Sequence, residues 1–163
     1  MSLSADIALL RSVPFLSILG EEEARLVAFG AERRRMGEGE RLMREGSYSD
    51  GAYVIVAGRI LATTKTGKEE HLAPGTIVSP LALVSEIEHP QTALAVEQSE
   101  VLKISRSLFR RVMEEYPHVA QALQERIADQ LAALSPELQR ILDELEAQDG
   151  DGDGDGNDEG ADA

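Results

Sequence analysis

Three histidines are the first residues of this chain to consider for chemistry, because an imidazole can bind a metal ion or carry a proton. They are His71, His89 and His118, and no two of them are close together in the sequence. Two lie near expected strand ends or turns, and the third begins an expected helix. A surface position explains this scatter, so we expect no metal site. The absence of cysteine also excludes disulfides, thiolate zinc sites and a cysteine nucleophile.

A short segment, Ser79-Pro80-Leu81-Ala82-Leu83-Val84, could instead hold an anion. Serine is favoured at a helix N-cap and proline at the first helical position, so the segment predicts one or two helical turns. The first N–H groups of such a turn have no partner within the helix and can bind an anion. Neither Ser79 nor Ser85 stands in a pattern that would activate it as a nucleophile, and no Walker loop occurs. We therefore expect a binding protein and not an enzyme.

The acidic end of the chain is the third candidate. Residues 149–163 contain seven acids and no base, which accounts for half of the net charge of −14. The run Asp151-Gly152-Asp153-Gly154-Asp155-Gly156 matches the first half of a calcium loop. The eighth position would be Asp158 instead of an apolar residue, and the twelfth would be Asp162 instead of glutamate. We expect a disordered acidic tail, with weak calcium binding as the alternative.

The charge and hydropathy of the chain limit its partners. An acidic protein gains little from counterion release on DNA, so we expect no direct DNA binding. The densest basic spots, Arg33-Arg34-Arg35 and Arg110-Arg111, are short enough to be solvated positions or partners of nearby carboxylates. No apolar run reaches the length of a membrane span, and the first residues lack the pattern of a secretory signal. We therefore expect no membrane association and a cytoplasmic location.

These candidate residues need a framework, and the sequence changes character along its length. Residues 6–30 fit two helices, with Leu26 and Phe29 among the apolar positions of the second. Residues 31–104 contain short β-type runs separated by glycines, which predicts an antiparallel β-roll or jelly roll. The clearest of these runs are 52–56, 59–63, 93–96 and 101–104. The predicted fold class is therefore α+β, mainly β, with helices before and after the β-region.

Helical patterns return after Ser105. One helix is expected up to Pro117, a second from about His118 to Leu134, and a third over 135–148. A stripe of leucine and isoleucine at alternating spacings of four and three runs along the last two helices. Its members are Ile127, Leu131, Leu134, Leu138, Ile141 and Leu145. The stripe packs either on the protein's own β-region or on a second copy, and both alternatives stay open. The expected partners are therefore a second copy, forming a homodimer through the C-terminal helices, and an unknown protein.

The order of these segments resembles the cyclic nucleotide-binding domain family over about 14–134. The likeness is carried by an ordered set of short motifs, each weak alone: Pro14-Phe15-Leu16, Gly39-Glu40-Arg41-Leu42-Met43-Arg44-Glu45-Gly46, Asp50-Gly51-Ala52-Tyr53-Val54-Ile55-Val56-Ala57-Gly58, Leu72-Ala73-Pro74-Gly75, Leu81-Ala82-Leu83 and Pro90-Gln91-Thr92-Ala93. The resemblance implies a β-roll that holds a cyclic nucleotide at a short helix and the segment after it. We call residues 79–93 the cassette.

The cassette departs from the family pattern at its charged positions. The family reads Phe-Gly-Glu-x-Ala-Leu-Leu and then Pro-Arg-Ser/Thr-Ala, where the glutamate binds the ribose hydroxyl and the arginine pairs with the cyclic phosphate. Here Ser79, Pro80 and Gln91 stand at the glycine, glutamate and arginine positions. The resemblance therefore implies a degenerate ligand site without catalytic or metal-binding residues, made by Ser79, Leu81, Ala82, Gln91, Thr92 and Ala93.

The predicted function is a non-catalytic regulatory or sensor module that binds cAMP or cGMP weakly or not at all. It requires no cofactor, and a cyclic nucleotide or another small molecule is the expected class of ligand. Two alternatives stay open: a protein-interaction or dimerisation module without a ligand, and a cupin-like jelly-roll enzyme. The predicted domains are 1–134, the nucleotide-binding-like domain with its flanking helices, 135–148, an extra helix, and 149–163, the acidic tail.

Overall fold

The structure is a computed structural model that describes residues 2–134. The chain divides into two compact units, one up to Ala122 and one from Leu123 onwards, and the boundary falls inside the last described helix. The expected helix over 135–148, the acidic tail and the C-terminal half of the leucine and isoleucine stripe lie outside the described residues. The predicted domain limits therefore stay predictions.

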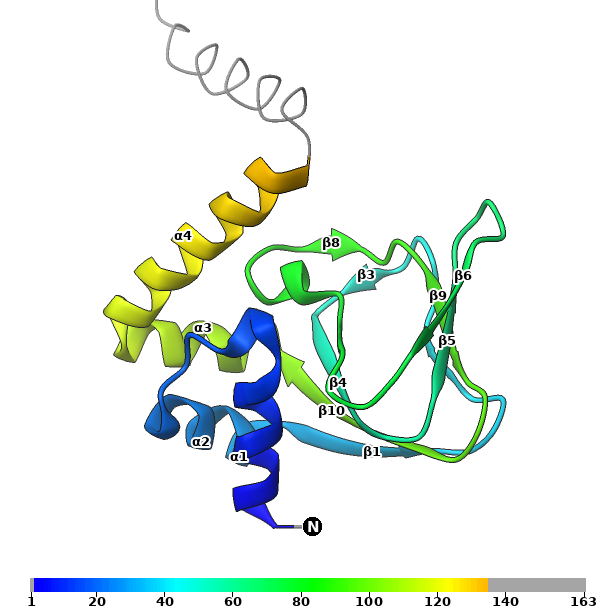
Figure 1. The fold of residues 1–163 in the computed structure, drawn as a ribbon, viewed down its shortest axis with the longest axis horizontal. Coiled ribbons are helices and arrows are strands. Elements are labelled where there is room, and N and C mark those ends of the chain that lie inside the picture. The colour runs from blue at the N-terminus through cyan, green and yellow to red at the C-terminus, as the bar shows by residue number, and fades with distance from the viewer. Residues whose placement is uncertain (1, 135–163) are drawn as a thin grey trace, which may run out of the picture. The chain divides into compact units, whose positions relative to one another are not determined.

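Short helices begin the first unit and pack against one another (Figure 1). They are α1 (Leu3–Ser12), the 3-10 turn η1 (Pro14–Leu16) and α2 (Glu21–Gly30). Helix α2 buries Ala24 and Val27, whereas Leu26 is 38% exposed and Phe29 is 81% exposed. The apolar positions that the sequence indicated for this helix thus lie on its outer face, because small residues form the side that packs inward.

Ten antiparallel strands follow within the described residues, arranged in three sheets (Figure 1). The first sheet has the order β1-β10-β4-β7, the second β2-β9-β5-β6, and the third is the pair β3-β8. The strands are β1 (Glu32–Met36), β2 (Arg41–Met43), β3 (Tyr48–Ser49), β4 (Gly51–Ala57), β5 (Ile60–Thr63), β6 (Glu69–Leu72), β7 (Ile77–Val78), β8 (Ile87–Glu88), β9 (Thr92–Ala95) and β10 (Ser99–Ser105). This arrangement confirms the predicted β-roll.

The two four-stranded sheets share one core. Only 4% of the residues of the chain are aromatic, and the buried side chains of this core are mainly aliphatic. They come from both sheets: Met36, Leu42, Met43, Tyr53, Ile55, Ile60, Ala62, Leu72, Val78, Ala93, Ala95 and Val101. Close pairing of the long strands β4 and β10 depends on Gly51, because a β-carbon there would overlap the carbonyl oxygen of Ile104. The roll is therefore held by apolar burial between sheets and by strand pairing within them.

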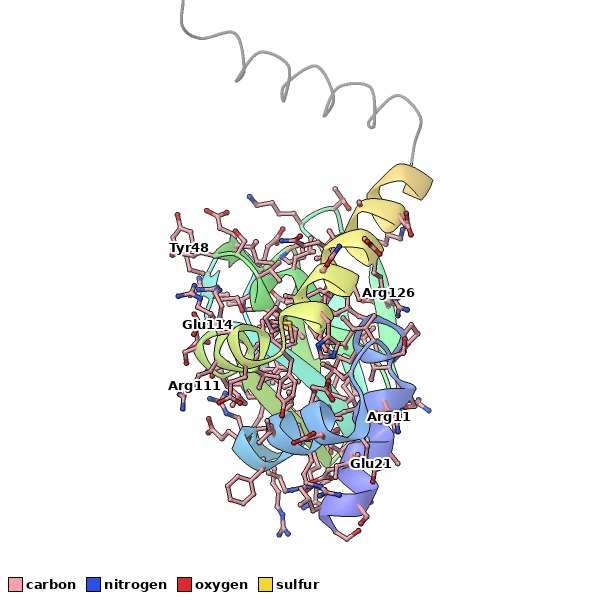
Figure 2. The ribbon with its side chains drawn as sticks, turned by 90° about the vertical axis from the view of Figure 1, so that its left-hand side faces the viewer. Arg11, Glu21, Tyr48, Arg111, Glu114 and Arg126 are labelled. Carbon is pink, nitrogen blue, oxygen red and sulfur yellow. The ribbon has the colours of Figure 1, made fainter. Side chains whose placement is uncertain are left out.

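Two further helices follow the strands: α3 (Arg106–Glu115) and α4 (Pro117–Leu134). The Ser105 hydroxyl caps α3 by accepting a hydrogen bond from the Leu108 N–H at 3.1 Å. Phe109 and Val112 are buried on the inner side of α3, and Figure 2 shows Arg111 and Glu114 directed outward from it. Within residues 2–134, no helix combines the length and the apolar character that crossing a bilayer requires.

Candidate ligand site

The cassette begins with the short helix that the sequence predicted. It is the 3-10 helix η2, which spans Pro80–Leu83. The Ala82 N–H donates to the Ser79 carbonyl at 3.0 Å, and the Val84 N–H donates to the Leu81 carbonyl at 3.2 Å. Proline is accommodated at the start because the first N–H of the helix needs no partner inside it.

Ser79 has an unusual backbone conformation. Its φ is 57° and its ψ is 52°, which makes it the one non-glycine residue with positive φ among residues 2–134. The glycine of the family pattern stands at this position, so the left-handed turn is kept here although the residue is serine. A side chain in this conformation clashes with its own backbone, at a cost of roughly 1–2 kcal/mol.

The Ser79 hydroxyl does not cap the helix, although the sequence indicated an N-cap serine. It instead lies 3.0 Å from Nδ1 of His89. The two residues are ten positions apart, and the turn between η2 and β8 brings them together. The cassette is therefore closed on itself by a side-chain hydrogen bond between its first residue and a residue near its end.

His89 is buried, with only 6% of its surface exposed, which corrects the expected surface position. The backbone N–H of His89 donates to the Ser47 carbonyl at 2.8 Å, and the backbone carbonyl of His89 accepts from the Gly46 N–H at 3.0 Å. Burial lowers the pKa of His89, and the negative charge of Asp50 opposes this effect only in part. The imidazole is therefore neutral at pH 7 and adds no positive charge to the cassette.

A cavity of about 320 Å³ opens between β6, the start of the cassette and the turn before β9. Its walls are mostly apolar, and its lining residues are Glu70, Leu72, Thr76, Ile77, Val78, Ser79, Pro80, Leu81, Ile87, Pro90 and Gln91. A cavity of this size is at the small end of the range for ligand sites. The carboxylate of Glu70 is the one charged group of this lining.

The predicted site residues divide into two groups. Ser79, Leu81 and Gln91 line the cavity. Ala82 and Ala93 are fully buried, and the Thr92 hydroxyl accepts a hydrogen bond from the Glu45 N–H at 3.0 Å. These last three residues are not among those that line the cavity.

Arg106 is a residue of the site that the sequence did not reveal. Its guanidinium donates to the Ala82 carbonyl at 2.8 Å and also to the Ser49 carbonyl. The backbone N–H of Arg106 donates to the Asp50 carbonyl at 2.7 Å. The Arg106 side chain at the start of α3 thus links η2 to the end of β3. This contact depends on the tertiary fold and leaves no pattern in the sequence.

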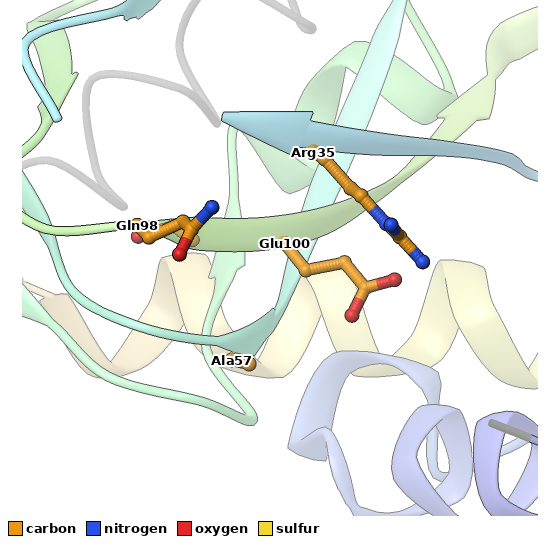
Figure 3. A pocket seen from close by; sticks show the side chains of 5 residues that line it. Arg35, Ala57, Gln98 and Glu100 are labelled. Carbon is orange, nitrogen blue, oxygen red and sulfur yellow. The ribbon is translucent and has the colours of Figure 1, made fainter. Parts of the chain in front are cut away.

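Neither basic run lines the cavity. In the first run, Arg33 contacts Asp6 and Glu100, and Arg34 contacts Glu32 at 3.1 Å. Arg35 lines a shallow surface hollow with Ala57, Gln98, Ser99 and Glu100 (Figure 3). The prediction that these arginines are solvated or pair with nearby carboxylates is therefore correct. Among residues 2–134, no group of three or more His, Asp or Glu side chains is arranged to hold a metal ion.

Comparisons with known proteins match this geometry. The profile of the family described as the cyclic nucleotide-binding domain matches residues 33–116. A solved cyclic nucleotide-binding-like protein from Brucella abortus is 38% identical, covers 67% of this chain and 97% of its own, and superimposes with a TM-score of 0.61. The N-terminal domain of a transcriptional regulator from Streptomyces coelicolor shares the fold at 23% identity, with a TM-score of 0.68 over 77% of this chain and 91% of its own.

A curated relative extends the comparison. The cyclic AMP receptor protein of Thermus thermophilus is 27% identical over 134 residues, which is 79% of this chain. The match covers 62% of that relative, so this chain spans less than two thirds of its length. With a matching profile over half of the sequence, the same order of helices and strands, and the cassette in its place on the roll, the chain belongs to the cyclic nucleotide-binding domain family.

Proposed function

We propose that this chain is a non-catalytic sensor module whose pocket does not hold cAMP or cGMP firmly. The observation that carries the proposal is the lining of the cavity, where the described residues include no cationic side chain. The family's cassette pairs the cyclic phosphate with an arginine, and Gln91 stands at that position. Its amide can donate hydrogen bonds but cannot neutralise a phosphate.

The expected loss of affinity is large. A charge-assisted hydrogen bond contributes about 1.5–3 kcal/mol, so each missing contact lowers affinity by roughly ten- to a hundred-fold. Pro80 stands at the position of the family's glutamate, so the carboxylate that would bind the ribose is missing. Proline also lacks a backbone N–H that could donate to a ligand. Glu70 adds a negative charge to the pocket, which repels a cyclic phosphate further.

Calorimetry with cAMP and cGMP tests the proposal. We expect no saturable binding by the parent chain with a dissociation constant below about 10 µM. The double variant Pro80→Glu with Gln91→Arg restores both family contacts, and we expect it to gain at least about tenfold in affinity for cAMP. Tight binding of cAMP by the parent chain would overturn the proposal.

The remaining parts of the predicted function are proposals of the same kind. An acidic net charge of −14 supports the absence of direct DNA binding by this chain, and a cytoplasmic location stays part of the proposal. Homodimerisation through the stripe that starts at Ile127 is tested by light scattering of Leu138→Glu against the parent. A dimer that becomes a monomer supports it, and a parent that is already monomeric contradicts it.

A further inference from the structure

The cavity beside the cassette has a charge of its own, and that charge is negative. Glu70 and Leu72 lie two residues apart on β6, so they face the same side of the strand, and both line the cavity. Leu72 is buried at 7% exposure, whereas Glu70 is exposed. The leucine therefore belongs to the cavity wall and the carboxylate to its solvent-facing rim.

The pairing of β6 with β5 fixes the face of the strand on which Glu70 lies. Strand β6 is an edge of its sheet and pairs with β5, with Ala62 opposite Glu70 and Ile60 opposite Leu72. A shift by one residue would exchange the two faces of β6 and remove Leu72 from the core, which the apolar burial opposes. Because Glu69 and His71 alternate with these residues, they belong to the opposite face of the strand.

The polar groups at the cavity are available to a ligand. Within residues 2–134, Glu70 makes no ion pair and the Gln91 side chain makes no hydrogen bond. Ser79 is already engaged with His89, whose ring is neutral because burial lowers its pKa. A ligand therefore meets mostly apolar walls together with the Glu70 carboxylate, the Gln91 amide and Thr76.

We propose, building on the proposed function, that this pocket binds a small amine: a flat or compact apolar body with a protonated amino group directed toward Glu70. The apolar body replaces water against Leu72, Val78 and Ile87. The ammonium group pairs with the Glu70 carboxylate at the rim, where a phosphate would be repelled. The pocket of this chain thus selects the charge opposite to that of a cyclic nucleotide.

Three probes with the same ring and different charges test the proposal: tryptamine, 3-methylindole and indole-3-acetate. Calorimetry and the midpoint of thermal unfolding are measured with each. We expect tryptamine to bind about tenfold more tightly than indole-3-acetate, with 3-methylindole between them, because an exposed ion pair changes affinity only modestly. Glu70→Gln should bring the three affinities together without abolishing binding of 3-methylindole.

Glu69→Gln is the matched control, because it removes the same charge from the opposite face of the same strand. It should leave the ranking of the probes as in the parent. Equal binding of tryptamine and indole-3-acetate, an equal effect of both variants, or no binding of any probe at about 5 mM would each overturn the amine proposal. None of these results depends on the cAMP titration, so the proposed function fails or stands separately.

Discussion

Two polar clusters of this protein differ in charge: one is built on ion pairs, and the other on a neutral hydrogen bond. In the first, the Arg33 guanidinium joins α1 to the first sheet by contacting Asp6 at 2.5 Å and Glu100 at 2.6 Å. Both carboxylates are largely buried, with side-chain exposures of 11% and 16%. The hydrogen bonds that Arg33 donates to Asp6 and to Glu100 raise the pKa of Arg33, so its guanidinium stays positively charged.

The second cluster, formed by Ser79 and His89 in the cassette, contains no charge at pH 7. Its hydrogen bond is neutral, and burial keeps the imidazole unprotonated. The difference teaches that this chain retains paired charges where they hold the fold together and lacks them where the family binds phosphate. The lack of a cationic side chain is therefore a property of the pocket and not of the whole protein.

Breaking the charged cluster should have the largest effect. Arg33→Ala leaves Asp6 and Glu100 without their shared cation, and removing one partner of a buried pair is strongly destabilising. Because Arg33 is 27% exposed, we expect a loss of about 2–3 kcal/mol in the free energy of unfolding, below the range for fully buried pairs. Urea denaturation at pH 7 measures this loss.

Arg35→Ala is the control for that measurement. Arg35 is the same residue type on the same strand, two positions away, but it is exposed and makes no ion pair among residues 2–134. We expect a change within about 0.5 kcal/mol. If the two variants lose equal stability, the Arg33 cluster does not contribute as described.

Changing the neutral cluster should have a smaller effect, and its sign separates two causes. Ser79→Ala removes the hydrogen bond to His89 but keeps the left-handed strain, so we expect a loss of about 1 kcal/mol or more. Ser79→Gly removes the same hydrogen bond and also relieves the strain, which offsets roughly 1 kcal/mol. The midpoint of thermal unfolding should therefore be higher for Ser79→Gly than for Ser79→Ala. Equal midpoints would mean that the backbone at this position is not strained.

Sequence patterns were sufficient for the long elements of this fold. The apolar runs that became β4, β5, β9 and β10 lie between turn residues and are long enough to show strand character. The two-residue strands β3, β7 and β8 escaped this reasoning, because two residues carry no periodicity. They exist because neighbouring strands and the cassette hold them in place.

The site was predictable where it depends on local signals and not where it depends on register. The pair Ser79-Pro80 predicted the short helix η2. The sequence did not predict that the Ser79 hydroxyl would contact His89, ten residues further along the chain. Glu70 lines the cavity because β6 pairs with β5 in a fixed register. Arg106 reaches η2 because α3 packs beside it. Side chains brought together by tertiary contacts have no fixed spacing, so a single sequence cannot reveal them.

The smallest expected effect is the pH dependence that His89 gives to stability. Its pKa in the folded state lies below the ordinary value of 6.5, mainly because of burial, so the unfolded chain takes up a proton more readily. The contribution of neutral His89 is fully present above pH 6.5 and is lost as the pH falls toward the folded-state pKa. Each unit of difference corresponds to about 1.4 kcal/mol.

Replacing the imidazole by an uncharged amide isolates this contribution. The parent should lose stability as the pH falls from 7 through 6.5 and below, while His89→Gln should show a flatter profile over the same range. His71→Gln serves as the control, because it makes the same replacement at an exposed position on β6. A profile for His89→Gln that is as steep as that of the parent would mean that other groups carry the pH dependence, and that the cassette is not closed by a neutral histidine.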